Sequence, residues 1–260
     1  NVGKVRNFEI FLPSLQEQQS IVAKLDSVFA EIDRTIEIAE ASSIKTQDLF
    51  KKELTKTFLT NHEGWIKTTI EESCGIKSGI TLKKNLEKLA GDIPYLKVAD
   101  MNLEHNSEEI TTSSRYVMRA DISDRMILRK GSVIFPKRGG AIATNKKRLT
   151  KIDICVDLNI MSVHPLTSLS PQLLYYFFLN VDMTKLGSGS SIPQINHYDI
   201  LPLAITYPSN EDEQLKLVKK LKALKDESDS LSKIYYKKIG ELKKLKSLIL
   251  EQKLQLRESA

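Results

Sequence analysis

The sequence predicts an α+β protein: one mixed α/β globular domain with two long α-helices that form an antiparallel coiled coil. Apolar residues recur at alternating steps of three and four near both ends of the 260-residue chain, as in the seam of a coiled coil. The segment between these ends instead carries glycines, prolines and short β-branched runs, which are typical of strands and turns.

The first helix is predicted over residues 16–60. Ser14 and Glu17 have the spacing of a capping box, in which each side chain bonds the backbone of the other residue. The apolar series weakens at Ser43 and Thr46 and returns at Phe50. The positions expected to carry helix pairing are Leu25, Phe29, Ile32 and Ile36.

The middle segment, residues 61–208, reads as a mixed α/β domain with its own core. Residues 93–98, 132–136 and 159–165 resemble strands that end in turns. Residues 170–180 resemble a buried helix, with Ser170 as its N-cap and Pro171 at its first position.

The second helix is predicted from residue 209 onward, with Ser209 as its cap and three acidic residues in its first turn. The predicted seam is Leu217, Leu221, Leu224, Ser228, Leu231, Tyr235, Lys238, Leu242, Leu245, Ile249, Gln252 and Leu256. The residues expected to pair, either with the first helix or with another chain, are Leu217, Leu221, Leu224, Leu231, Leu242, Leu245 and Ile249. Changing Leu242 and Leu245 together to Asp is expected to destroy assembly.

Several function classes lack their usual motifs. There is no P-loop, no dinucleotide-binding glycine motif and no methyltransferase tripeptide of the Asn-Pro-Pro type. Cys74 and Cys155 lie far apart, and the four histidines lack metal-ligand spacing, so we expect no metal site. Because these enzyme motifs are missing, we expect a non-catalytic protein. The sequence shows no signal-peptide layout and no membrane-length apolar run, and two reduced thiols suit the cytoplasm. The net charge of +6 permits an anionic partner.

A strongly basic stretch, residues 129–151, is the main candidate for nucleic-acid contact. It contains no acidic residue, and its basic residues are Arg129, Lys130, Lys137, Arg138, Lys146, Lys147, Arg148 and Lys151. Lysine and arginine neutralise phosphates, and arginine can also bind guanine. The alternative interpretation is a solvated loop in a basic protein. If the stretch binds DNA, reversing the charge at Lys146, Lys147 and Arg148 should abolish binding and leave the fold intact.

Two further loops carry hydroxyl, amide and lysine side chains that suit a nucleic-acid backbone. They are residues 77–84 and 187–196, and alone each is a weak signal. Besides Lys137, Arg138, Lys146, Lys147 and Arg148, the candidate DNA-binding residues are Lys77, Ser78, Thr81, Lys83, Lys84, Asn145, Ser188, Ser190, Ser191 and Gln194.

An internal echo links the two ends of the chain. At one constant offset, the residue types of Asn1 to Pro13 match those of Asn196 to Pro208. Each of the two prolines is followed by a sequence typical of a helix start. Together with the "GDIPYLKVADM", "LRKGSVIFP", "DLNIM" and "GSGSSIPQIN" stretches, this order resembles the target-recognition domain and conserved spacer helix of type I restriction–modification specificity subunits. The resemblance covers essentially the whole chain.

That resemblance implies an organisation as well as a function. Residues 1–15 would be the end strand of a preceding recognition-domain-like unit, followed by a spacer helix (16–60), a target-recognition domain (61–208) and a second spacer helix (209–260). The family carries two recognition domains, so this chain would be either the C-terminal half of a subunit or a short form that dimerises.

In function, the resemblance implies a subunit that binds double-stranded DNA sequence-specifically and catalyses nothing. It would direct adenine methylation by methyltransferase subunits and restriction by a translocating nuclease subunit. S-adenosylmethionine, ATP and Mg²⁺ would belong to those partners. The alternatives are a coiled-coil scaffold that binds only protein and, less favoured, a recognition domain that itself transfers methyl groups.

Overall fold

The computed structural model describes residues 13–60, 62–186 and 193–255. The chain divides into two compact units. The first contains the part of the chain up to Phe50 together with the part from Leu224 onward, and the second comprises Lys51–Ala223. None of the helices in the described ranges combines the length and the apolar character that crossing a bilayer requires.

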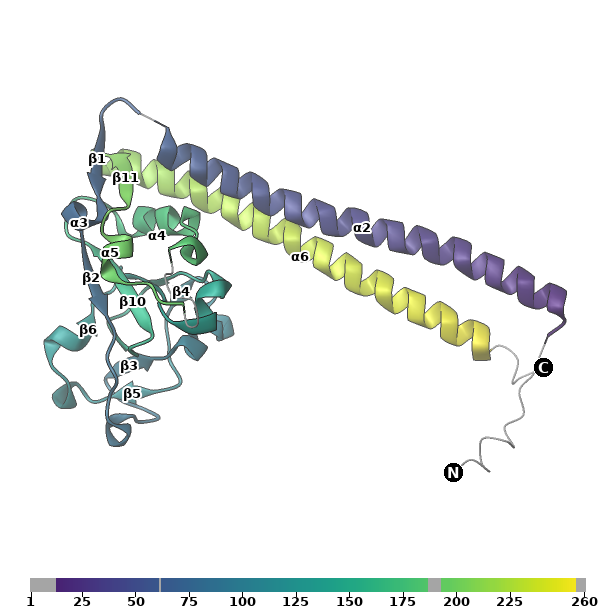
Figure 1. The fold of residues 1–260 in the computed structure, drawn as a ribbon, viewed down its shortest axis with the longest axis horizontal. Coiled ribbons are helices and arrows are strands. Elements are labelled where there is room, and N and C mark those ends of the chain that lie inside the picture. Colours follow the sequence, from purple (N-terminus) through teal and green to yellow (C-terminus); the bar gives the residue numbers. More distant parts are fainter. Residues whose placement is uncertain (1–12, 61, 187–192, 256–260) are drawn as a thin grey trace. The chain divides into compact units, whose positions relative to one another are not determined.

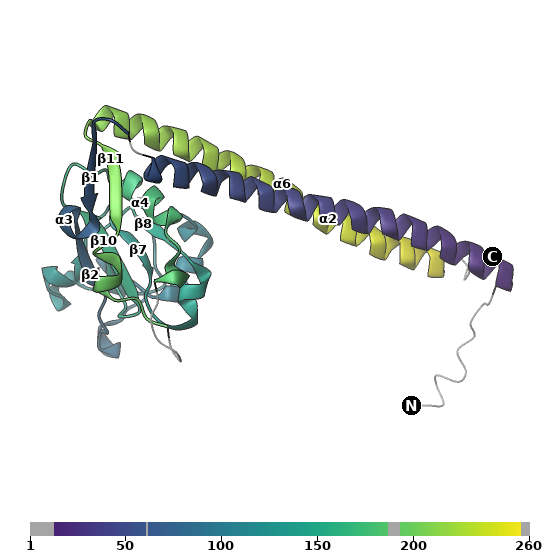
Figure 2. The same ribbon diagram turned by 45° about the horizontal axis from the view of Figure 1, so that its top comes forward.

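Two 45-residue helices, α2 (Leu15–Leu59) and α6 (Glu211–Gln255), are the longest elements, and the part of α2 up to Phe50 and the part of α6 from Leu224 make up the described first unit. Within this unit they lie side by side (Figures 1 and 2). Ile32, Ile36 and Ala39 of α2 form an apolar cluster with Ile239 of α6. Nearby, Lys246 Nζ lies 2.7 Å from the Asp33 carboxylate. An early part of α2 therefore meets a late part of α6, which confirms the predicted antiparallel pairing.

The seam of α6 differs from the predicted one after Ser228. Ser232, Ile239 and Lys246 face inward in the first unit, whereas Leu231 and Leu245 are exposed. Lys238 is likewise exposed, so the assignment of these three positions to the seam was wrong. Tyr235, Leu242 and Ile249 pack against the apolar cluster as predicted, with Phe29 from α2.

The helix starts show which caps the sequence identified correctly. Glu17 N donates to Ser14 Oγ at 3.4 Å and Ser14 N donates to the Glu17 carboxylate at 3.0 Å, which confirms the capping box. At α6 the cap is Asn210, whose Oδ1 accepts from Asp212 N at 2.8 Å. Ser209 instead donates to Gly64 O at 3.2 Å, so its assignment as the cap was wrong.

The second unit contains short strands and helices. Its strands are β1 (Trp65–Thr69), β2 (Cys74–Ser78), β3 (Ile93–Leu96), β4 (Glu109–Ile110), β5 (Tyr116–Val117), β6 (Ile127–Leu128), β7 (Val133–Pro136), β8 (Arg148–Thr150), β9 (Ile154–Val156), β10 (Ile160–Pro165) and β11 (Ala204–Pro208). Its short α-helices are α3 (Ile70–Ser73), α4 (Pro171–Asn180) and α5 (His197–Ile200). The 3₁₀ turns are η1 (Lys84–Leu86), η2 (Val98–Asn102), η3 (Glu104–Asn106), η4 (Arg119–Asp121), η5 (Asp124–Met126), η6 (Gly139–Thr144) and η7 (Met183–Lys185). The three predicted strands appear as β3, β7 and β10, and the predicted helix as α4.

Three sheets organise this unit, with strand orders β2-β10-β7-β8-β4, β5-β3-β9-β6 and β1-β11. The core lies between the two larger sheets, where Ile134 and Ile160 of one meet Leu96 and Ile154 of the other. Helix α4 covers the five-stranded sheet, because Phe178 stacks on Phe135 with ring centroids 5.6 Å apart. Ser170 Oγ accepts from Leu173 N at 3.1 Å, which confirms it as the N-cap of α4.

The ends of the long helices belong to the same unit as the sheets. Phe58 of α2 packs edge-on against Phe177 of α4 at 5.6 Å, and its carbonyl accepts from Thr206 Oγ1 of β11 at 3.0 Å. Gln214 of α6 is buried and donates to Pro208 O at 2.9 Å. Of the two echoed segments, the second forms α5 and β11, while residues 1–12 lie outside the described residues.

Candidate nucleic-acid interface

Three segments that are far apart in sequence meet at one edge of the five-stranded sheet. Strands β2 and β7 both run antiparallel to β10, so they run parallel to each other and end at the same edge. Lys137, directly after β7, donates from Nζ to Ser78 Oγ at the end of β2 at 2.8 Å. His197 Nε2, at the start of α5, lies 3.0 Å from the same hydroxyl.

The segment before α5 is fixed to the end of β7 by main-chain hydrogen bonds. Gly139 N donates to Pro193 O at 2.8 Å, and Ile195 N donates to Lys137 O at 2.9 Å. Between these bonds, Arg138 Nε donates to Gln194 Oε1 at 3.1 Å. The Arg138 guanidinium is therefore oriented, and among the described residues its other nitrogens stay available to a ligand.

Positive charge accumulates at this edge. Burial, followed by the charge of Arg138, lowers the pKa of Lys137 below its usual range. Burial, followed by the charge of Lys137, likewise lowers the pKa of His197. Among the described residues no carboxylate forms an ion pair with Lys137 or Arg138. The nearby Asp199 is engaged elsewhere, since its carboxylate accepts from Asn196 N at 2.7 Å and completes the capping box of α5. An anion bound here would relieve the repulsion between neighbouring cations.

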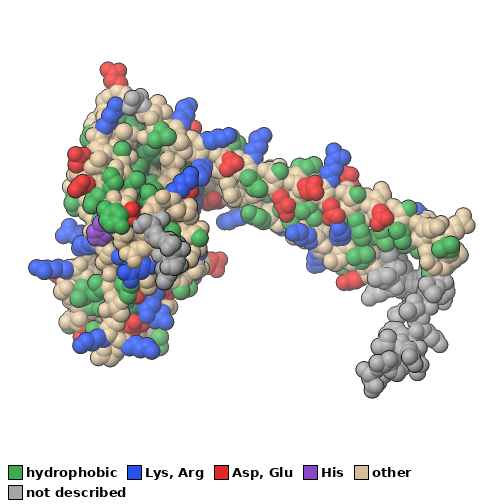
Figure 3. Space-filling view, viewed as in Figure 1, with side chains coloured by type: hydrophobic (Ala, Val, Ile, Leu, Met, Phe, Trp, Pro, Cys, Tyr) green, Lys and Arg blue, Asp and Glu red, His purple; other side chains and the backbone are tan. Residues whose placement is uncertain are grey.

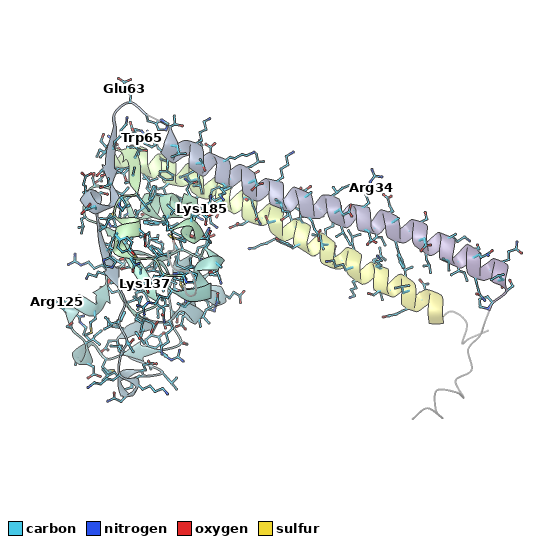
Figure 4. All side chains as sticks on the ribbon, viewed as in Figure 1. Arg34, Glu63, Trp65, Arg125, Lys137 and Lys185 are labelled. Carbon is cyan, nitrogen blue, oxygen red and sulfur yellow. The ribbon has the colours of Figure 1, made fainter. Side chains whose placement is uncertain are left out.

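The surface views agree with this arrangement. In Figure 3 several Lys and Arg side chains surround the histidine visible on this face. Figure 4 places Lys137 near the middle of the face and Arg125, from η5, at its margin. We refer to Ser78, Lys137, Arg138, Gln194 and His197 as the sheet-edge cluster.

The other residues predicted in the 77–84 and 187–196 loops lie around this cluster or outside the described residues. Lys77 is exposed on β2, and its Nζ lies 3.5 Å from Ile127 O. Thr81 and Lys83 are exposed on the loop that follows β2, and Lys84 is exposed at the start of η1. Within the described part of the chain these three are accessible to a ligand, but none of them joins the cluster. Ser188, Ser190 and Ser191 lie outside the described residues.

The second half of the basic stretch does not form part of the exposed interface. Lys147 is only 2% exposed, and its Nζ donates to Asn145 Oδ1 and Val181 O, both at 2.6 Å. Burial lowers its pKa to about 8. Asn145 also accepts from Met183 N at 2.9 Å and adopts a left-handed backbone, with φ of 51°. Lys147 and Asn145 therefore join two loops instead of facing a ligand.

The neighbours of Lys147 are also bound to the protein itself. The Arg148 guanidinium donates to Asn106 O at 2.6 Å, Lys147 O at 2.8 Å and Met101 O at 3.1 Å. Lys146 Nζ donates to Asn102 Oδ1. The expectation that reversing these three charges would leave the fold intact was wrong, because it would bury a carboxylate and leave carbonyls unpaired.

Two basic residues near the interface are not among the residues predicted from the sequence. His197 is one of four scattered histidines, and its position directly after the Gln194–Asn196 segment is the one signal that points to it. Arg125 carried no local signal, because it reaches the margin through the fold of η5. Among the residues that the structure describes, no group of three or more His, Cys, Asp or Glu side chains could hold a metal ion.

Comparison with known protein families shows the family to which this chain belongs. The family described as "Type I restriction modification DNA specificity domain" matches residues 62–239, which is more than half of the chain. The chain belongs to this family. The matched range contains the whole sheet-edge cluster, so the interface lies inside the specificity domain. No curated protein matches the chain.

Solved structures share the fold of this specificity domain. A chain from a structure titled for complex assembly and conformational transition of the type I R-M system has a TM-score of 0.77 and 20% identity. The HsdS subunit from Thermoanaerobacter tengcongensis has a TM-score of 0.61 and 21% identity, and the type I S subunit from M. genitalium has 0.51 and 15%. The matches cover 94%, 95% and 92% of this chain but only 60%, 60% and 61% of those chains.

Proposed function

We propose that this chain reads part of a double-stranded DNA target for a type I restriction–modification enzyme. The observation that carries the proposal is the convergence of Ser78, Lys137, Arg138 and Gln194, from three separate segments, into one cationic cluster. Its cations form no ion pair with any carboxylate of the described residues. Hydroxyl, amide and lysine groups suit phosphate positioning, and an oriented guanidinium suits a guanine edge. The shared fold and the family assignment support the same reading.

The proposal includes partners. Methyltransferase subunits, guided to adenines by this chain, would supply S-adenosylmethionine, and a restriction–translocation subunit would supply ATP and Mg²⁺ chemistry. The chain itself would bind no cofactor and catalyse no step, as is general for specificity subunits. It would act in the cytoplasm, either within a longer two-domain subunit or as a pair of identical copies held by α2 and α6.

Changing both Lys137 and Arg138 to Gln tests the DNA interface. The doubly substituted chain should bind duplex DNA about tenfold or more weakly, because two phosphate-neutralising charges are lost. The slope of log K against log salt should fall by about 0.9 for each phosphate contact removed. Fluorescence anisotropy with a labelled duplex, measured from low to moderate salt, gives both quantities.

The matched control changes Lys216 and Lys219 to Gln, which removes the same net charge from exposed positions on α6. This control should keep wild-type affinity and slope. Equal losses in both variants would assign binding to net charge alone and contradict the interface. A wild-type chain that binds no duplex at low salt would instead favour the protein-binding scaffold.

A further inference from the structure

A second cationic site lies on the opposite face of β2 from Ser78. Side chains alternate along a strand, so Lys77 points away from the side that carries Ser78. There it lines a cavity of about 290 Å³ together with Arg129, Ser132, Ser162 and His164. This volume is slightly below the about 300–1,000 Å³ typical of drug-sized ligands, so the cavity suits a compact group.

The hydrogen bonds fix how His164 faces this cavity. Ser132 Oγ donates its one proton to Arg129 O at 2.7 Å, so it must accept from His164 Nδ1, which lies 3.2 Å away. That contact places the ring proton on Nδ1 and leaves Nε2 without a hydrogen. His164 pairs across the strands with Gly75, so no side chain stands opposite the imidazole. Protonation would turn Nε2 into a donor.

The charges around His164 come from three neighbouring elements. Burial, and then Arg129 and Lys77, lower the pKa of His164, while Asp153 opposes them. Within the described chain no carboxylate forms an ion pair with Lys77 or Arg129. Asp153 accepts a hydrogen bond from Lys130 N at 2.8 Å. The cavity thus holds two uncompensated cations and one imidazole that a bound anion would help to protonate.

We propose that this cavity binds a phosphate group through Lys77, Arg129 and the Nε2 of His164. Two cations and one imidazole that line the same small cavity favour an anion, because charge-assisted hydrogen bonds are the strong ones. The phosphate could belong to the DNA backbone or to a free ligand, and the chemistry of the site is the same for both. The inference stands independently of the proposed DNA interface.

Nuclear magnetic resonance of the His164 imidazole in the full chain at pH 6.0 tests the site. Inorganic phosphate should shift the His164 signals saturably if a free phosphate group is bound. Arg129→Gln should weaken that binding by about tenfold, and Lys130→Gln by less than about twofold. Lys130 is the matched control because it is adjacent and exposed but does not line the cavity.

A second variant guards against an effect of misfolding. His164→Asn can still donate to Ser132 Oγ, because the Asn amide takes the place of Nδ1, yet it lacks the atom in the place of Nε2. Because this variant has no imidazole signal, its phosphate binding is followed through the backbone amide shifts of the residues that line the cavity. Binding should weaken while the amide spectrum keeps its wild-type dispersion. Unchanged phosphate affinity in both Arg129→Gln and His164→Asn would contradict the site.

A duplex DNA arm distinguishes the source of the phosphate. If inorganic phosphate has no effect but duplex DNA shifts the His164 signals, and Arg129→Gln lowers the salt slope by about 0.9, the ligand is a backbone phosphate. If neither probe shifts the signals, the proposal is overturned even where the chain binds DNA through Lys137 and Arg138. Phosphate binding by a chain that binds no DNA would support the cavity and refute the proposed function.

Discussion

At the scale of single residues, burial decides which basic side chains an outside ligand can reach. Lys137 and Lys147 both belong to one basic stretch, but only the first ends at an accessible edge. Lys147 donates to a backbone carbonyl and to Asn145, and its pKa falls to about 8 because burial disfavours the charged form. A lysine in this state contributes to the fold in a way that depends on pH.

We predict that Lys147 makes the protein more stable as pH rises from about 8 toward 10.5. In that window the unfolded chain binds more protons than the folded one, so the free energy of unfolding increases with pH. The increase should total about 2–3 kcal/mol. Lys147→Met should remove this increase in urea unfolding curves recorded at several pH values. Lys146→Met, beside it, should retain the increase, and a wild-type slope in Lys147→Met would refute the assignment.

The residue scale is also where the sequence was least informative about the site. The number of charges in residues 129–151 does not distinguish Lys137 and Arg138 from Lys147 and Arg148, because it does not show where each side chain points. Contacts between residues far apart in sequence decide where a side chain points. Arg148 begins β8, and its guanidinium donates to the carbonyls of Asn106 and Met101, about 40 positions away in sequence. Lys137 and Arg138 became a site only once β2, β7 and the segment before α5 met at one edge.

At the scale of elements, local patterns predicted both long helices and part of the sheet core. Helix caps and apolar spacing depend on neighbours in sequence, so Ser14, Ser170 and the strands β3, β7 and β10 could be found. The short strand β4 could not, because it pairs in parallel with β8, a partner about 40 positions along the chain. Two-residue strands also lack enough positions to show alternation.

The seam register of α6 shows the limit of a strict heptad. An ideal α-helix drifts relative to a 3.5-residue repeat, and a spacing of 11 residues brings a stripe back into line. Leu221 and Ser232, both buried, are separated by this spacing. The seam takes two successive steps of four, from Leu224 to Ser228 and on to Ser232. After that point the inward positions are Ser232, Ile239 and Lys246 instead of Leu231, Lys238 and Leu245.

We predict that Ile239 and Leu245 contribute very differently to the helix pair. Ile239 is 7% exposed and Leu245 is 46% exposed, although the strict heptad selects Leu245. Ile239→Ala should cost about 2–4 kcal/mol in amide-exchange stability of Phe29–Ala39 on α2, because it leaves a cavity in the seam. Leu245→Ala should change it by less than about 0.5 kcal/mol. Equal effects of the two substitutions would contradict the shifted register and support an uninterrupted heptad seam.

At the scale of the whole molecule, the boundaries of the compact units do not coincide with the point where the amino-acid composition changes. Composition changes near residue 61, yet the sheet-containing unit begins at Lys51 and ends at Ala223. Periodicity assigns a residue to a helix but does not reveal which partner that stretch of helix packs against. Thr55 Oγ1 lies 2.7 Å from Asn180 Oδ1 of α4, and Phe58 packs against Phe177, so the end of α2 helps to build the sheet unit.

We therefore predict that the end of α2 and the sheets unfold together. Phe58 is 5% exposed whereas the adjacent Leu59 is 75% exposed, which makes the two a matched pair. Phe58→Ala should lower the free energy of unfolding by about 3–5 kcal/mol, since it empties a site against α4. The lone Trp65, at the start of β1, supplies a fluorescence signal for urea unfolding of this unit.

Leu59→Ala should shift that unfolding midpoint little, because its side chain already faces water. If Phe58→Ala leaves the Trp65 transition unchanged, the sheet unit is stable without the end of α2, and its boundary lies where the composition changes. If the transition moves to lower urea as expected, the duplex affinity at 25 °C should still match wild type wherever the variant remains folded. The helix end would then support the recognition unit without contacting the DNA.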